Sequence, residues 1–314
     1  MPPQTNSQLS ASSDRNTRSR SQWRSWLPFT GGAGLKSLQL VPAYVAGGVL
    51  VFLLLSSLTG FLLPPEAPWL WRRLLDEAIL ATAAIAPAFV VARVEERSFG
   101  AYGLPQQEAF GKPFWIGAAW GLVSLTTLLI LLRIAGAISF EGLAIHGARI
   151  GKFSLFWALF FVLVAFSEEF AFRGYLLFAF SRAIGFWPSA LLSSLIFGYL
   201  HHLNPGENWV GAAGAGAIGL FLSFTVRRTG NLWFAVGMHA AWDWCETFLY
   251  SVPDSGFVLP GHLLRTSLHG SSWLTGGSVG PEASVLLFVL VAVLSIVLNH
   301  LYPQAKYGVP DPSH

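Results

Sequence analysis

Apolar segments of about the length that a helix needs to cross a bilayer follow one another along the chain, separated by polar or Pro- and Gly-rich joins. They run over residues 40–63, 74–92, 114–132, 153–180, 188–203, 209–226, 232–250 and 283–301. Helices are the structures that satisfy their own backbone hydrogen bonds in lipid segment by segment. The pattern therefore predicts an all-α, polytopic transmembrane helix bundle with about eight spans.

The polar ends of the chain predict two tails around a transmembrane domain over residues 37–302. Residues 1–36 carry five basic side chains and one acid, Asp14, which is typical of a disordered basic cytoplasmic tail. The first 25 residues lack the apolar core of a secretory signal, although a Ser- and Arg-rich start is also found in organelle transit peptides. We favour a cell (inner) membrane protein of bacterial type. Residues 303–314 form the short C-terminal tail.

The composition of the chain argues against some classes of function and some kinds of site. The chain is 53% hydrophobic and 11% charged, against about 25% charged in soluble domains. So few charges argue against nucleic acid as a partner and make the lipid bilayer the expected surroundings. One cysteine, Cys245, excludes an internal disulfide and a cysteine-based zinc cluster. Of the 19 Lys and Arg residues, 13 fall on the same side as the N-terminus, which predicts cytoplasmic termini for a multi-pass protein.

Two adjacent acids, Glu168 and Glu169, interrupt the fourth apolar segment together with Arg173. A charge at this depth costs on the order of 3 kcal/mol on insertion scales, so a chain that keeps three is expected to use them. Glu169 and Arg173 are four residues apart, about 40° around a helix, and are expected to pair. Glu168 lies about 100° away without a same-helix partner. We expect it to face a polar intramembrane cavity, where a carboxylate suits a general base.

Two more constellations lie on the following apolar segments. Phe197 and His201 are four residues apart and share a helix face, as do His239 and Asp243. A lone histidine in an apolar helix is most often a packing residue. Three such groups within about 75 residues are hard to explain by packing, because each adds a polar group in the membrane. We therefore expect them to form one functional site.

The motifs Glu-Glu-x-x-x-Arg, Phe-x-x-x-His and His-x-x-x-Asp resemble the pattern of the CAAX prenyl proteases and bacteriocin-processing enzymes, also called Abi or CPBP intramembrane glutamic endopeptidases. The resemblance covers about residues 95–250. It implies that Glu168 and His201 activate a water molecule and that His239 stabilises the oxyanion. Many relatives have Asn at the position of Asp243; because an ionised Asp donates no hydrogen bond, we assign Asp243 to orienting His239.

The remaining motif residues, Glu169, Arg173 and Phe197, are expected to be structural or substrate-positioning. The resulting hypothesis is a membrane-embedded endopeptidase without a cofactor, whose substrate is a peptide or a membrane-anchored protein. A zinc-dependent variant stays open, with Glu168, His201 and His239 giving one oxygen and two nitrogen ligands. A catalytically silent immunity or scaffold protein stays open as well, and so does a proton-relaying transporter.

Overall fold

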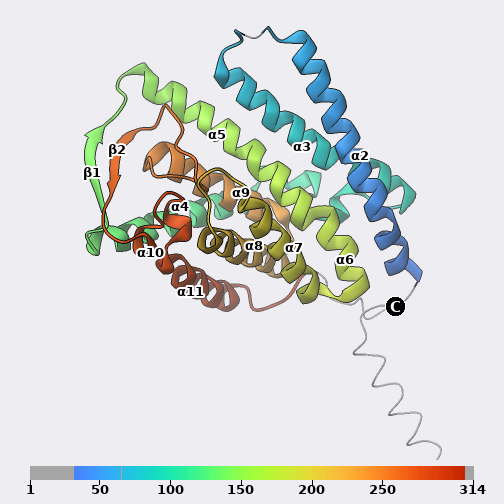
Figure 1. The fold of residues 1–314 in the computed structure, drawn as a ribbon. Helices are drawn as coiled ribbons and strands as arrows, with labels where there is room; N and C mark the ends of the chain where they lie inside the picture. Colours follow the sequence, from blue (N-terminus) through green and yellow to red (C-terminus); the bar gives the residue numbers. More distant parts are fainter. Residues whose placement is uncertain (1–31, 65, 308–314) are drawn as a thin grey trace, which may run out of the picture.

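The computed structural model describes residues 32–64 and 66–307, and within them the chain is a bundle of helices (Figure 1). The main helices are α2 (Gly32–Leu62), α3 (Trp69–Val94), α4 (Lys112–Ile134), α5 (Ala148–Glu169), α6 (Leu176–Ile184), α7 (Phe186–His201), α8 (Trp209–Thr229), α9 (Leu232–Trp244) and α11 (Val285–Leu301). This confirms the all-α class. Most of the predicted N-terminal tail and the last residues of the predicted C-terminal tail lie outside the described residues.

Each predicted apolar segment is helical, but the helices differ in length. In the described part of the chain, the stretches long and apolar enough to cross a membrane are Leu35–Leu62, Trp69–Val94, Lys112–Ile134, Ala148–Ile184 and Trp209–Thr229, five in all. Helices α7, α9 and α11 are shorter, with 16, 13 and 17 residues. The chain is a multi-pass membrane protein in which short helices pack among long ones.

Two π-helical turns interrupt the predicted helical segments, one within the first motif and one just after the third. Residues Phe170–Tyr175 form one between α5 and α6, and Gly174 within it leaves the helical region at ψ −112°. Residues Cys245–Leu249 form the other, at the end of α9. Such turns widen the helix by one residue and are frequent at functional sites. The fourth apolar segment is therefore kinked at Gly174, five residues after the acid pair, rather than one straight helix.

Glycines bring the motif-bearing helices into close backbone contact. A Cβ atom at Gly117 or Gly121 of α4 would overlap the carbonyl oxygen of Phe234 or Met238 of α9. A Cβ atom at Gly198 of α7 would overlap a carbonyl oxygen of the Gly-rich helix α8. Small residues drive this kind of packing in membranes, where helices approach without a hydrophobic force between them. The small residues thus fix α7 and α9 against their neighbours.

Asparagine side chains cap the N-termini of α8 and α9. The side chain of Asn208 accepts hydrogen bonds from the amides of Val210 and Gly211 at the start of α8, at 2.8 and 3.1 Å. Asn231 accepts one from the Trp233 amide at 2.8 Å and so caps α9. Asn is among the preferred N-cap residues because its side chain satisfies free backbone donors. Gly230, at φ 72°, ends α8 just before this cap.

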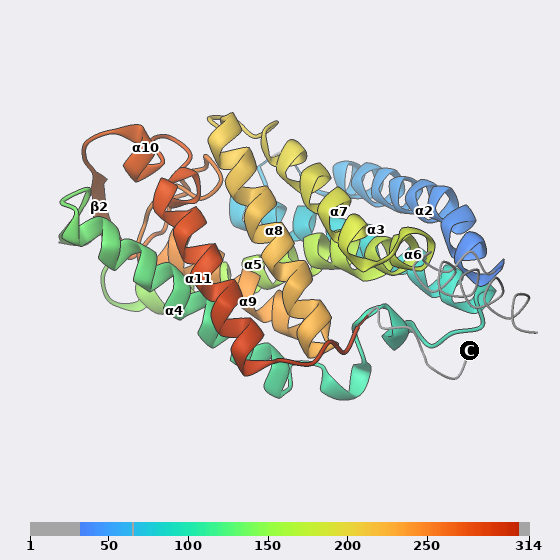
Figure 2. The ribbon, with the colours of Figure 1, turned by 90° about the horizontal axis from the view of Figure 1, so that it is seen from below.

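A small antiparallel sheet closes one end of the bundle. Strand β1 (Ile138–Leu143) pairs with β2 (Leu264–Leu268), in the register Ile138↔Leu268 and Phe140↔Thr266. The sheet lies at the opposite end of the bundle from α2 and most of α3 in both ribbon views (Figures 1 and 2). Strand β2, the short helix α10 (Ser272–Thr275) and a 3₁₀ turn (Pro281–Ala283) belong to the long connection between α9 and α11.

Candidate active site

A cavity of about 210 Å³ opens between α5, α7 and α9. The four residues that the sequence assigned to catalysis come from these three helices and all line it: Glu168, His201, His239 and Asp243. Phe197 of the second motif lines it as well. The rest of the wall near α5 combines the aromatic and apolar side chains of α5 with Arg73 and Glu77 of α3; the α5 residues are Trp157, Phe160, Phe161 and Val164.

Beside this cavity, Glu169 and Arg173 form the predicted ion pair. The Arg173 Nη1–Glu169 Oε1 distance is 3.1 Å and both side chains are 0% exposed. The guanidinium also lies 4.3 Å from the ring centroid of Phe197, close enough for a cation–π contact. A Cβ atom at Gly219 of α8 would overlap the guanidinium. The Gly-rich face of α8 therefore makes room for a buried charge, in addition to packing against α7.

Glu168 forms no ion pair with Arg173 and lines the cavity, as the helix geometry predicts. Its Oε2 lies 3.7 Å from His239 Nε2, which is too long for a hydrogen bond. The same oxygen is buried and has no hydrogen-bond partner among the described residues. The side chain as a whole is 31% exposed, toward the cavity. Glu168 thus presents an acceptor that no described residue satisfies.

His239 is held from both sides of its ring. Its Nδ1 lies 2.9 Å from Glu169 Oε1, and its Nε2 lies 3.2 Å from Asp243 Oδ2. Carboxylates on both nitrogens fit a ring that donates from each. The sequence predicted the Asp243 contact from the four-residue spacing but not the Glu169 contact, because the two residues lie on different helices, 70 positions apart. Glu169 therefore holds Arg173 and His239 at once.

His201 has a defined tautomer in its neutral form. Its Nδ1 lies 2.9 Å from the carbonyl oxygen of Phe197, which only accepts, so Nδ1–H donates. The lone pair of Nε2 is then available to accept a hydrogen bond. The imidazole also packs on the Phe197 ring, with centroids 4.2 Å apart. Phe197 thus contacts Arg173 and His201, which links the first two motifs.

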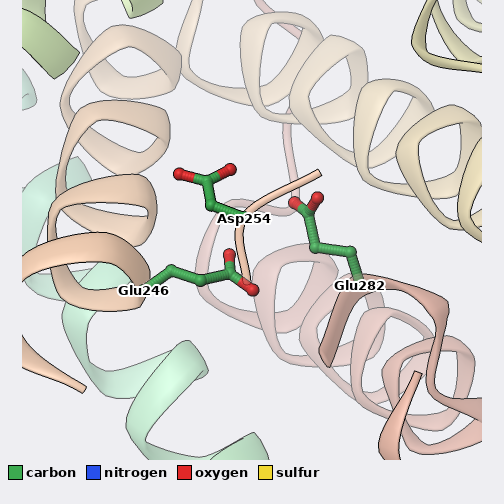
Figure 3. Close-up of side chains that lie close together, drawn as sticks. All are labelled: Glu246, Asp254 and Glu282. Atoms are coloured by element: carbon green, nitrogen blue, oxygen red, sulfur yellow. The ribbon is translucent and has the colours of Figure 1, made fainter. Parts of the chain in front are cut away.

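The zinc ligands considered from the sequence do not come together as a group. In residues 32–64 and 66–307, the acidic and histidine side chains that each place a ligand atom within 4.8 Å of the others are Glu246, Asp254 and Glu282 (Figure 3). Glu168, His201 and His239 do not meet this spacing. Sequence reasoning missed the acidic group, although Glu246 carries a signal: it is an acid three residues after Asp243 in an apolar segment.

Comparison with known families agrees with the motifs. Residues 150–245 match the family model described as type II CAAX prenyl endopeptidase Rce1-like. This segment is therefore similar to the Rce1-like family. No curated protein and no solved structure matches the chain. The Rce1-like segment runs from the start of α5 into the π-helical turn after α9, so it contains all three motifs, and it supports a CAAX-type membrane endopeptidase acting on a peptide or protein.

Proposed function

We propose that the protein is an intramembrane endopeptidase in which Glu168 and His201 activate a water molecule to cut a peptide bond. One observation carries the proposal: three motifs from separate helices line a single cavity, inside a segment of a CAAX-type endopeptidase family. The carboxylate of Glu168, whose side chain is 31% exposed, and Nε2 of His201 are both hydrogen-bond acceptors on residues that line the cavity, where such a water would lie.

The reaction follows from these roles. Glu168 takes one proton from the water, and the resulting hydroxide attacks the carbonyl carbon of the scissile bond, which forms a tetrahedral oxyanion. His239 donates from Nε2 to that oxyanion, while Glu169 keeps the ring in place through Nδ1. The C–N bond then breaks, and the proton held by Glu168 passes to the leaving amine. The carboxylate of Glu168 is restored.

The cavity wall suggests the substrate class. Apart from Arg73 and Glu77, the wall beside Glu168 is made of aromatic and apolar side chains, and the surrounding helices include long apolar ones. A soluble, charged peptide gains little from such a wall, whereas an apolar segment of a membrane-anchored protein buries surface against it. We therefore propose that the natural substrate is a peptide or protein anchored in the same bilayer. Until the substrate binds, Asp243 Oδ2 accepts the hydrogen bond from His239 Nε2–H and so keeps this donor oriented.

Purified protein in lipid vesicles tests the proposal against a transporter and a silent protein. We expect membrane-anchored peptides carrying a fluorophore and a quencher across their apolar segment to be cleaved by wild type and not by Glu168→Gln. Glu141→Gln, an exposed acid-to-amide change on β1, is the matched control and should behave as wild type. Cleavage that Glu168→Gln retains would overturn the assignment of the base. Solute uptake without any cleavage would favour the transporter.

A further inference from the structure

A second group of carboxylates lies outside the roles described above. Glu246 comes from the π-helical turn after α9, Asp254 from the loop that follows, and Glu282 from the 3₁₀ turn before α11. Each places one oxygen within 4.8 Å of the others, and Figure 3 shows the three side chains around the same stretch of loop. We refer to these three residues as the acidic cluster.

Two members of the acidic cluster are buried, Asp254 is half-buried, and none has a basic partner among the described residues. Glu246 is 0% exposed and Glu282 is 7% exposed. The ion pairs found among the described residues involve Arg173 and His239, and none includes a member of the cluster. Three carboxylates this close repel one another strongly in a low-dielectric interior. The fold therefore leaves their charge to be neutralised by something other than Lys or Arg.

Hydrogen bonds orient two of the carboxylates and leave oxygens free. Thr247 Oγ1 donates to Asp254 Oδ2 at 2.8 Å, and Ser255 Oγ donates to Glu282 Oε2 at 2.6 Å. These bonds hold each of the two acids in place by one oxygen. Asp254 and Glu282 also line the wall of the cavity, which gives an ion a path to the cluster from outside.

Glu246 supplies the observation that points to a ligand. Its Oε2 accepts a hydrogen bond from Trp242 Nε1 at 2.9 Å. Its Oε1 is buried and has no hydrogen-bond partner among the described residues. A buried carboxylate oxygen without a partner is costly, because it loses its water and gains nothing in return. An unsatisfied oxygen beside two further acids is the arrangement expected of a cation site before its ion is bound.

We propose that Glu246, Asp254 and Glu282 bind one hard divalent cation, Ca²⁺ or Mg²⁺. The donor set is all oxygen, which suits these ions, whereas zinc sites in proteins use nitrogen and sulfur ligands more often. The bound ion would join the end of α9 to the two loops before α11. Protons are the competing neutraliser: burial, followed by the charge of Asp243, raises the pKa of Asp254. This site does not depend on the proposed peptidase activity.

Calorimetry on the purified protein in detergent, stripped with a chelator, tests the site directly. Titration with CaCl₂ and, separately, with MgCl₂ should give one ion per chain for at least one of the two, together with a rise in the unfolding temperature. Glu246→Gln and Asp254→Asn keep the shape of the side chain and remove one charged ligand each. Either should weaken binding at least about tenfold, since affinity follows the number of charged ligands. Glu141→Gln is the matched control and should bind as wild type.

Three results would contradict the proposed cation site, and a second variant keeps the test possible if the first does not fold. No heat and no stabilisation at about 10 mM Ca²⁺ or Mg²⁺, roughly tenfold above the dissociation constants of the weakest calcium modules, would mean that protons neutralise the cluster. Equal binding by wild type and both variants would place the ion elsewhere. Zinc binding alone, lost in the variants, would refute the hard-cation assignment. If Glu246→Gln fails to fold, Asp254→Asn at the cavity wall carries the test.

Discussion

Two buried carboxylates near α9 differ in how their charge is neutralised: Glu169, at the end of α5, contacts α9 through His239, and Glu246 lies in the turn that follows α9. Glu169 is 0% exposed and contacts Arg173 at 3.1 Å and His239 at 2.9 Å, so its charge is balanced within the fold. Glu246 is equally buried, and its neighbours Asp254 and Glu282 are acids. The group around Glu169 fixes the geometry of the cavity by itself. The group around Glu246 depends on protons or on an ion from outside.

The largest effect is expected on protein stability, when the charge of Glu169 is removed. Glu169→Gln leaves Arg173 as an unpaired buried cation, for which breaking a buried pair elsewhere costs about 3–5 kcal/mol. We expect little folded protein in membranes, measured by size-exclusion yield and unfolding temperature. Glu246→Gln is the matched change in the unbalanced group; with both variants purified in chelator, so that no ion is bound, it should keep or raise the yield, because it removes repulsion between carboxylates. Equal losses in both variants would erase the distinction between the two groups.

The next largest effect is expected on turnover, when His239 is removed. His239→Ala removes the proposed oxyanion donor, and loss of one such donor elsewhere costs about 10²–10³ in rate. We expect turnover to fall by that amount while substrate binding, measured by fluorescence anisotropy, stays near wild type. His300→Ala, an exposed histidine on α11, is the control. A drop below tenfold would remove His239 from the proposed mechanism.

Dialysis against a strong chelator separates the two groups with one treatment. The proposed chemistry at Glu168 and His201 uses no metal, so turnover measured well below the unfolding temperature should survive. The unfolding temperature itself should fall by several degrees, as expected when a bound stabilising ion is removed, and return with Ca²⁺ or Mg²⁺. Loss of turnover that zinc restores would instead support the zinc-dependent peptidase.

The smallest effect is expected at Asp243. Asp243→Asn keeps an oxygen that accepts from His239 Nε2 and adds an amide that donates to the oxyanion. Turnover should stay within about threefold of wild type, far less than the loss of about 10²–10³ that removal of a donor produces. Asp243→Leu, of similar size without an acceptor, should lose substantially more. A large loss in the Asn variant would show that the carboxylate charge itself is needed.

Spacing along single helices was enough to predict much of this site. Four-residue intervals predicted the contact of Glu169 with Arg173, of Phe197 with His201 and of His239 with Asp243. The cost of charge in lipid singled these residues out against the apolar background. The prediction that they share one site rested on the occurrence of three such groups close together in the sequence, because each group alone is weak evidence. The roles assigned to them stay predictions until activity is measured.

Contacts between residues on different helices could not be predicted from the sequence. Nothing in the spacing indicates that Glu169 reaches His239, because helix packing brings them together across 70 residues. The acidic cluster draws on a π-helical turn and two loops, whose courses depend on tertiary contacts rather than on periodicity. The kink between α5 and α6 was missed for a related reason: a π turn keeps the apolar pattern of a helix.

The central claim is that Glu168 is the base of a protease that acts in the membrane. Its most direct test compares, without choosing a substrate beforehand, the membrane-protein fragments of cells that carry wild type with those of cells that carry Glu168→Ala. We predict that a defined set of new termini in or next to apolar segments is present with wild type and absent with Glu168→Ala at equal protein levels. Identical fragment sets in the two strains would contradict the claim.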